Sequence, residues 1–198
     1  MSELTVESVA SFNVRRLTVP IPGVRDFQAR YERVVPNVPL DRVRQLVASG
    51  APWSAMVELI DAAAPYGFLI YFRNDVHGVM ANAGHSADCV AYLMGNHVIA
   101  EQMFRHDPRA MLYAPLRTLI WEDPAGHAWF SADQPSTQFA SLGIPDVETV
   151  GELLDRKLAL LLEELEVPVP GPLVATQRTS SGPANQDPGP DQPGSTSS

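Results

Sequence analysis

Apolar residues recur along the chain at two spacings, one typical of helices and the other of strands. The clearest helical pattern lies at 146–166, where steps of three and four form one apolar stripe: Val147, Val150, Leu154, Leu158, Leu161 and Leu165. Asp146 is a candidate cap for this helix. Similar spacing predicts helices at 24–34, at 40–48, from Pro52 to Pro65 and at about 97–106.

Alternation of apolar and polar residues predicts the strands. They are expected at 12–19, 68–77, 86–94, 116–122 and 127–133. Proline and glycine in Asp123-Pro124-Ala125-Gly126 favour a type I turn, and therefore a hairpin between the last two strands. Hairpins interspersed with long helices predict an α+β fold, a two-layer sandwich with a mainly antiparallel sheet and helices packed on one face.

The length of 198 residues favours a single domain. We expect a flexible N-terminus at 1–10, one α+β domain at 11–168 and a disordered tail at 169–198. The stretch from Gly171 to Ser198 is rich in glycine, proline and serine. Such a composition buries too little apolar surface to offset the entropy lost on ordering.

The net charge is -9, with 23 acidic residues against 14 basic ones. This balance repels phosphate backbones and anionic membranes, so we expect neither nucleic acid nor a membrane as partner. The sequence shows no basic-apolar leader and no apolar stretch of about 18 residues, which predicts a cytoplasmic protein. The single cysteine, Cys89, excludes an intramolecular disulfide and a cysteine-rich zinc site, and we interpret it as an inert thiol.

Metal and cofactor motifs are not evident. The five histidines form no HxH or HxxxH pair: they are His77, His85, His97, His106 and His127. The sequence also has no Walker loop, no dinucleotide fingerprint and no serine elbow. We therefore predict no metal site and no cofactor.

Aromatic and charged residues share one predicted face of the sheet, if helices cover the small apolar sets of the strands. The face would carry Tyr71, Arg73, Asp75, Tyr92, Arg117, Trp121, His127, Trp129, Ser131 and Asp133. It can be interpreted as a solvated face, a dimer interface or a ligand site. We predict a small-molecule ligand, with a homodimer as the expected assembly. The predicted binding residues are Tyr71, Arg73, Tyr92, Asn96, Arg117, Trp121, Trp129 and Gln134.

A second candidate site lies where Gly95-Asn96-His97 joins a strand to a helix. Gly95 permits the tight turn and Asn96 can cap the helix, which by itself explains both residues. The positive end of the helix favours a neutral His97, a potential general base, and Asp133 could supply a carboxylate. The alternative function is thus a cofactor-independent isomerase, lyase or cyclase with these two residues as acid and base. A structural or interaction protein is the third hypothesis.

Four segments carry a family resemblance: 91–97 (AYLMGNH), 99–108 (IAEQMFRHDP), 112–122 (LYAPLRTLIWE) and 130–135 (FSADQP). With the closing helix, they resemble the domain-of-unknown-function family numbered 302 over roughly residues 50–168. The resemblance implies a compact two-layer α/β fold similar to the TATA-binding protein, often a dimer, and it implies no agreed activity or catalytic residues. Many relatives have proline after the Gly-Asn pair, where this chain has His97.

Overall fold

The computed structural model describes residues 10–174, so the expectations for 1–9 and 175–198 lie outside the described residues. Five antiparallel strands form one sheet in the order β1-β5-β4-β3-β2. The strands are β1 (Arg16–Pro20), β2 (Leu69–Asp75), β3 (Cys89–Gly95), β4 (Leu116–Glu122) and β5 (Ala128–Asp133). β4 and β5 form the predicted hairpin, in which Gly126 N–H donates to Asp123 O at 2.9 Å.

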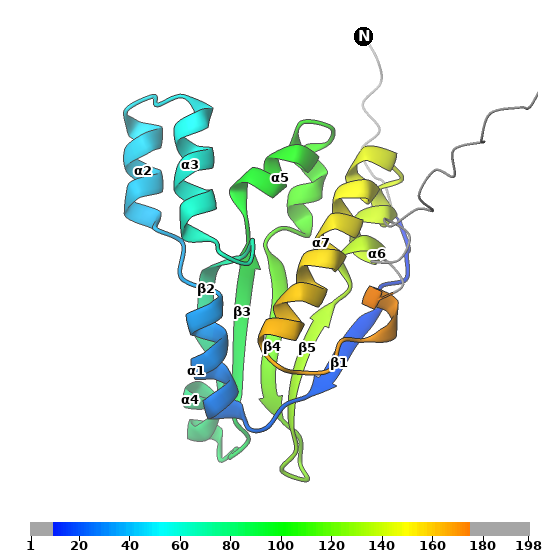
Figure 1. Cartoon of the computed structure of the whole chain (residues 1–198). Coiled ribbons are helices and arrows are strands. Elements are labelled where there is room, and N and C mark those ends of the chain that lie inside the picture. The colour runs from blue at the N-terminus through cyan, green and yellow to red at the C-terminus, as the bar shows by residue number, and fades with distance from the viewer. Residues whose placement is uncertain (1–9, 175–198) are drawn as a thin grey trace, which may run out of the picture.

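The helices lie on one side of this sheet (Figure 1). α1 (Val24–Val34) and α7 (Pro145–Glu164) cross the sheet, with α5 (His97–Phe104) and α6 (Pro135–Phe139) beside α7. α2 (Leu40–Ala48) and α3 (Trp53–Ala63) form a pair beyond the sheet, and α4 (Val76–Met80) follows β2. Three short 3-10 helices complete the described part: η1 (Ala81–Ala83), η2 (Pro108–Leu112) and η3 (Ala140–Leu142). The predicted α+β fold with helices on one face of an antiparallel sheet is confirmed.

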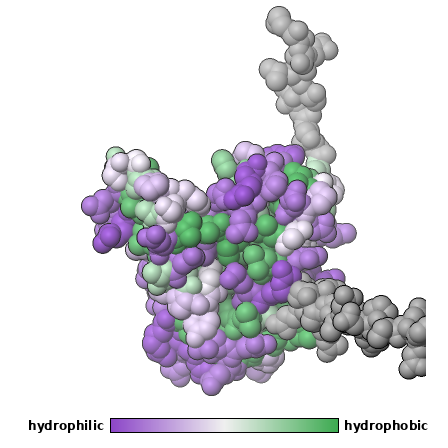
Figure 2. All heavy atoms as spheres, turned by 45° about the horizontal axis from the view of Figure 1, so that its top comes forward, coloured by the Kyte–Doolittle hydropathy of each residue, from purple (hydrophilic) through white to green (hydrophobic). Residues whose placement is uncertain are grey.

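Two apolar cores hold these layers together. The larger lies between the sheet and its helices, where Phe27 and Tyr31 of α1 meet Phe130 of β5 with ring centroids within 6 Å. The smaller lies under the α2–α3 pair around the fully buried Ile60 and Leu69. Figure 2 shows apolar residues in a band between the α2–α3 pair and the other helices, bordered by polar residues. Removal of this apolar surface from water is the main stabilising contribution.

Three local predictions were wrong. Asp146 does not cap α7, because the helix already begins at Pro145 and Asp146 lies in its first turn. The strand expected at 68–77 ends at Asp75, whose carboxylate accepts a hydrogen bond from Gly78 N–H at 3.2 Å and caps α4. Residues 169–174, assigned to the tail, belong to the fold, since Leu173 is fully buried in the larger core.

Candidate functional site

The sheet face opposite α1 and α7 is hollowed into a groove of about 530 Å³, which we call the open-face groove. Side chains from all five strands line it: Arg16, Thr18, Phe72, Asn74, Ala91, Leu93, Arg117, Leu119, Trp121, Ser131 and Asp133. Its volume falls in the range of small-molecule binding sites. A concave surface of this size on the uncovered face makes it the leading candidate site.

Strand register arranges the groove in rows across the sheet. Along one row, Asn74 lies opposite Ala91, Ala91 opposite Leu119, and Leu119 opposite Ser131. The two residues in the middle of this row, Ala91 and Leu119, make the floor of the groove apolar. Two residues further along the strands, Phe72 pairs with Leu93, and its ring is 57% exposed. The groove therefore has an apolar floor with an aromatic side chain at its edge.

Hydrogen bonds fix the tryptophan at the other end of the groove. Trp121 Nε1–H donates to Ser131 Oγ at 3.0 Å, and Ser131 Oγ in turn bonds Thr18 Oγ1 at 2.9 Å. Trp129 lies opposite Trp121, with ring centroids 6.5 Å apart, and its Nε1–H donates to Asp123. The indole of Trp121 is thus held in one orientation on the open face, as a binding platform requires.

Charged side chains occupy the opposite end of the groove from Trp121. Asp133 Oδ1 pairs with Arg16 Nε at 3.0 Å, and Asp133 Oδ2 lies 3.7 Å from a terminal guanidinium nitrogen of Arg117. The two arginine side chains are 72% and 74% exposed, whereas that of Asp133 is 12% exposed. Two guanidinium groups share one carboxylate, so this end of the groove carries a net charge of about +1.

Three residues predicted for this face lie on the side of the helices instead: Arg73, Asp75 and Tyr92. In β2, the register shifts between Ile70 and Phe72, which is a β-bulge at Tyr71. A bulge adds one residue to one strand and reverses the alternation beyond it. Phe72 therefore lines the open-face groove, while Arg73 and Asp75 do not. The face predicted for Arg73 and Asp75 was wrong for this reason, and Tyr71, the extra residue of the bulge, does not line the groove either.

Tyr92 was also assigned to the wrong face, because the two sets of β3 side chains were exchanged. Val90, Tyr92 and Met94 are buried under the helices, and Tyr92 is only 1% exposed. Ala91 and Leu93 face the groove. The helix-covered side needs large side chains to fill the space between the layers, whereas the small set is compatible with a shallow open face. Of the predicted binding residues, Arg117 and Trp121 line the groove, and Trp129 lies beside Trp121. Tyr92 also borders the groove, although its hydroxyl bonds Glu32 on the helix-covered side.

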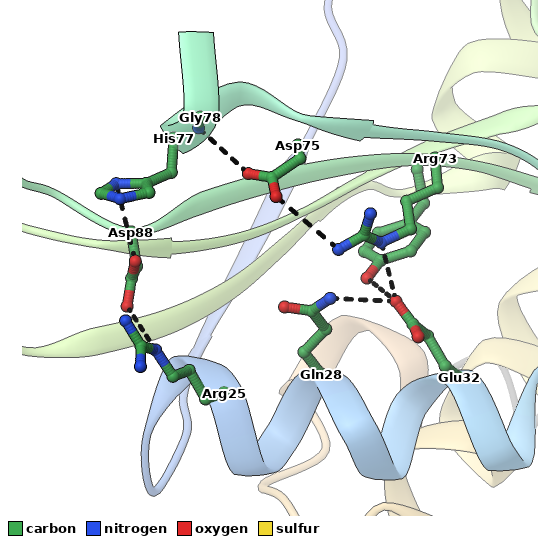
Figure 3. Close-up of polar contacts among 9 residues, drawn as sticks. Arg25, Gln28, Glu32, Arg73, Asp75, His77, Gly78 and Asp88 are labelled. Carbon is green, nitrogen blue, oxygen red and sulfur yellow. Dashed lines mark hydrogen bonds and ion pairs between the residues drawn. The ribbon is translucent and has the colours of Figure 1, made fainter. Parts of the chain in front are cut away.

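The displaced residues form a polar cluster that joins α1 to the sheet (Figure 3). Glu32 Oε1 accepts hydrogen bonds from Tyr92 OH at 2.6 Å, Arg73 Nε at 3.0 Å and Gln28 Nε2 at 3.0 Å. Partial burial of Glu32 opposes its ionisation, but these hydrogen bonds and the charge of Arg73 lower its pKa below the usual value. All three donors bond the same carboxylate oxygen, so the cluster ties α1 to β2 and β3.

A second set of charges extends this tie toward α4. Asp88 lies between Arg25 Nε, at 3.6 Å from Oδ2, and His77 Nδ1, at 3.6 Å from Oδ1 (Figure 3). Asp75 Oδ2 lies 3.9 Å from Arg73. All of these side chains connect neighbouring elements at the edge of the sheet, and none of them lines the open-face groove.

At the start of α5, Asn96 caps the helix, as predicted from its place in the Gly95-Asn96-His97 turn. Its side-chain oxygen accepts from the N–H groups of Val98 and Ile99 at 2.8 and 3.1 Å, and its Nδ2 donates to Gly67 O. His97 Nδ1 lies 2.8 Å from Tyr71 OH. Burial lowers the pKa of His97 and raises that of Tyr71 to about 12, so both are neutral near pH 7.

The structure does not bring His97 and Asp133 together as an acid–base pair. His97 contacts Tyr71, and Asp133 is held by Arg16 and Arg117. No hydrogen bond or ion pair joins the two residues within 10–174. The pair was predicted from the order of the elements, which does not fix the side of the sheet on which each side chain lies.

Gln134, predicted to bind a ligand, is buried in a hydrogen-bonded network at the start of α6. Its Nε2 donates to Asp155 Oδ2 at 2.5 Å, and its Oε1 accepts from Arg15 at 2.9 Å. Ser136 also bonds Asp155 through its N–H and its hydroxyl. Gln134 therefore links α6 and α7 to Arg15, the residue before β1. It does not line the open-face groove.

Metal ligands and membrane spans were searched over the described part of the chain. Residues 10–174 contain no group of three or more His, Cys, Asp or Glu side chains placed to hold a metal ion. Among the helices in the same range, none is both long and apolar enough to span a bilayer.

The architecture and the groove define a small α+β protein whose sheet carries helices on one face and a groove on the other. A family model described as "Domain of unknown function DUF302" matches residues 47–165, and the chain belongs to this family. Among solved structures, it is similar to an uncharacterised conserved DUF302 protein from Bacillus stearothermophilus, with a TM-score of 0.53 and 13% identity. The match covers 77% of this chain and 97% of that one. No curated protein matches significantly.

Proposed function

We propose that the protein binds a small molecule in the open-face groove. The observation that carries this proposal is the groove itself: about 530 Å³ of concave surface, with an apolar floor, an exposed Phe72 and a hydrogen-bonded Trp121. Pockets that combine an apolar lining with a few convergent polar groups are the usual form of a ligand site. This site replaces the predicted one, since Arg117 and Trp121 are retained and Phe72, Leu93 and Leu119 are added.

An uncharged fluorescent probe tests whether the groove binds apolar molecules, independently of the charged residues at its end. Nile red gains fluorescence in apolar surroundings, and we expect it to bind the full-length protein with one saturable site. Leu119→Asp places a carboxylate in the floor of the groove and should abolish this signal. Leu160→Asp is the matched control, because Leu160 is an exposed leucine of α7 that does not line the groove.

Three outcomes of the probe experiment separate the alternatives. Signal lost only in Leu119→Asp supports the groove as the site. Signal that persists in Leu119→Asp, or is lost equally in both variants, contradicts it. Native mass spectrometry of the same samples measures their oligomeric state. If the wild-type protein is a dimer that binds no probe, and Leu119→Asp is a monomer, a second copy of the chain covers the groove instead of a ligand.

A homodimer through this face is the second proposal for the same surface. It is supported by the exposed Phe72 and by the apolar floor, which a second copy could also bury. Acid–base chemistry is supported by the contact between Tyr71 and His97, with Tyr71 taking the place given to Asp133. We place it below binding because neither side chain lines the open-face groove.

A further inference from the structure

We infer that the open-face groove selects amphipathic carboxylates, with the anionic head at Arg16 and Arg117 and the apolar body toward Trp121. This inference rests on the proposed function, because it specifies the ligand class of the same site. Its basis is the uneven distribution of charge along the groove, which places both arginines at one end and the apolar floor and the indole beyond them.

Charge balance favours a single negative charge on the ligand. Within residues 10–174, Asp133 is the carboxylate that pairs with Arg16 and Arg117, so one of the two positive charges is not neutralised. A carboxylate supplies one negative charge and matches the two-pronged geometry of a guanidinium group, whereas a phosphate would add further charge next to Asp133. The exposure of both arginine side chains leaves their remaining N–H groups accessible to such a head group.

The length of the groove sets the distance between the two ends of the ligand. Arg117 and Trp121 are four residues apart on β4, which corresponds to about 13 Å along a strand. Leu119 lies between them on the same face. An extended alkyl chain can follow this line with its head at the arginines, its middle over Leu119 and its end against the indole. The buried alkyl surface would supply affinity, and the arginines would supply selectivity.

Three ten-carbon probes that differ only in the head group test this inference. Isothermal titration of the full-length protein uses decanoate and decyltrimethylammonium below their micelle concentrations and decanol below its solubility limit. The affinities should follow the order anion, neutral, cation. We expect decanoate to bind about tenfold more tightly than decanol, as charge-assisted hydrogen bonds to exposed groups allow. This preference should decline with added salt, because the arginines are exposed.

Two substitutions should change the selectivity in opposite directions. Arg117→Gln should remove most of the preference for decanoate over decanol. Asp133→Asn should strengthen decanoate binding several-fold, because the competing carboxylate is removed from both arginines. Arg109→Gln is the control: Arg109 forms a comparable exposed pair with Asp107 and does not line the groove.

The outcomes distinguish this inference from the proposed function. Equal affinity for all three probes, or an unchanged anion preference in Arg117→Gln, would overturn the carboxylate inference and leave the groove as a site for neutral apolar ligands. If none of the three probes nor Nile red binds the wild-type protein, both the inference and the proposed function fail.

Discussion

The two faces of the sheet treat their polar groups differently. On the helix-covered face, polar side chains are bonded to one another: Glu32 takes three hydrogen bonds, and Tyr31 OH lies 3.2 Å from both Thr118 Oγ1 and Met94 Sδ. On the open face, Arg16 and Arg117 share one carboxylate and expose most of their side chains. The polar groups of the covered face bond one another and fix the layers, whereas on the open face one of the two arginine charges is not neutralised among the described residues.

The largest difference between the faces should appear on adjacent residues of β5. Phe130 is buried against Phe27 and Tyr31, so Phe130→Ala should lower the free energy of unfolding by about 3–5 kcal/mol. Trp129 is its neighbour on the open side, and Trp129→Ala should cost about 1–2 kcal/mol, mostly from partial packing and the bond to Asp123. Urea unfolding of both variants measures the contrast. Similar losses would show that the open face is also buried in solution.

Much of the covered face could be predicted from the sequence, because helix periodicity and hairpin signals are local. The stripe from Val147 to Leu165 is buried along its whole length, as expected, and the turn at Asp123–Gly126 has the hydrogen bond expected between its first and fourth residues. The family was also identifiable from its segments, which the model match over 47–165 confirms. These features depend on residues a few positions apart, which is why the sequence carries them clearly.

The open face was predicted less well because it depends on one residue of register. The bulge at Tyr71 has no local signal such as a glycine, yet it exchanges the faces of Phe72 and Arg73. In β3, large and small side chains alternate, and the sequence does not say which set the helices need. A signal was available for Arg16 and Thr18, since they alternate with the buried Leu17 and Val19. That alternation would have placed both on the open face.

An intermediate effect is expected from Glu32, on the covered face. Glu32→Gln should lower the free energy of unfolding by about 1–2 kcal/mol at pH 7, because the charge-assisted bonds from Tyr92 and Arg73 are lost. The folded-state pKa of Glu32 is lowered below its ordinary 4.5. Its stabilisation is therefore complete above about pH 4.5 and is lost as the pH falls through the folded-state pKa.

Stability curves between pH 7 and pH 2 check this dependence. The wild-type protein should lose more stability than Glu32→Gln as the solution is acidified below pH 4.5, so that the two curves converge. Glu58→Gln is the control, since Glu58 is exposed on α3 and takes no part in the cluster. Parallel curves for the wild type and Glu32→Gln would mean that the carboxylate is not held in its charged form by Tyr92, Gln28 and Arg73.

The smallest effect on stability is expected from the two exposed arginines at the charged end of the open-face groove. Arg16→Gln and Arg117→Gln should each change the free energy of unfolding by less than about 0.5 kcal/mol, because exposed ion pairs are screened and their side chains lose entropy when fixed. Thermal unfolding against the wild type measures this. The same substitutions are expected to alter anion selectivity strongly. Substitutions on the covered face would thus change mainly stability, and those on the open face mainly binding. A loss above about 1 kcal/mol would show that the arginines stabilise the fold, as Glu32 is expected to do, and would argue against the proposal that they bind an anionic ligand.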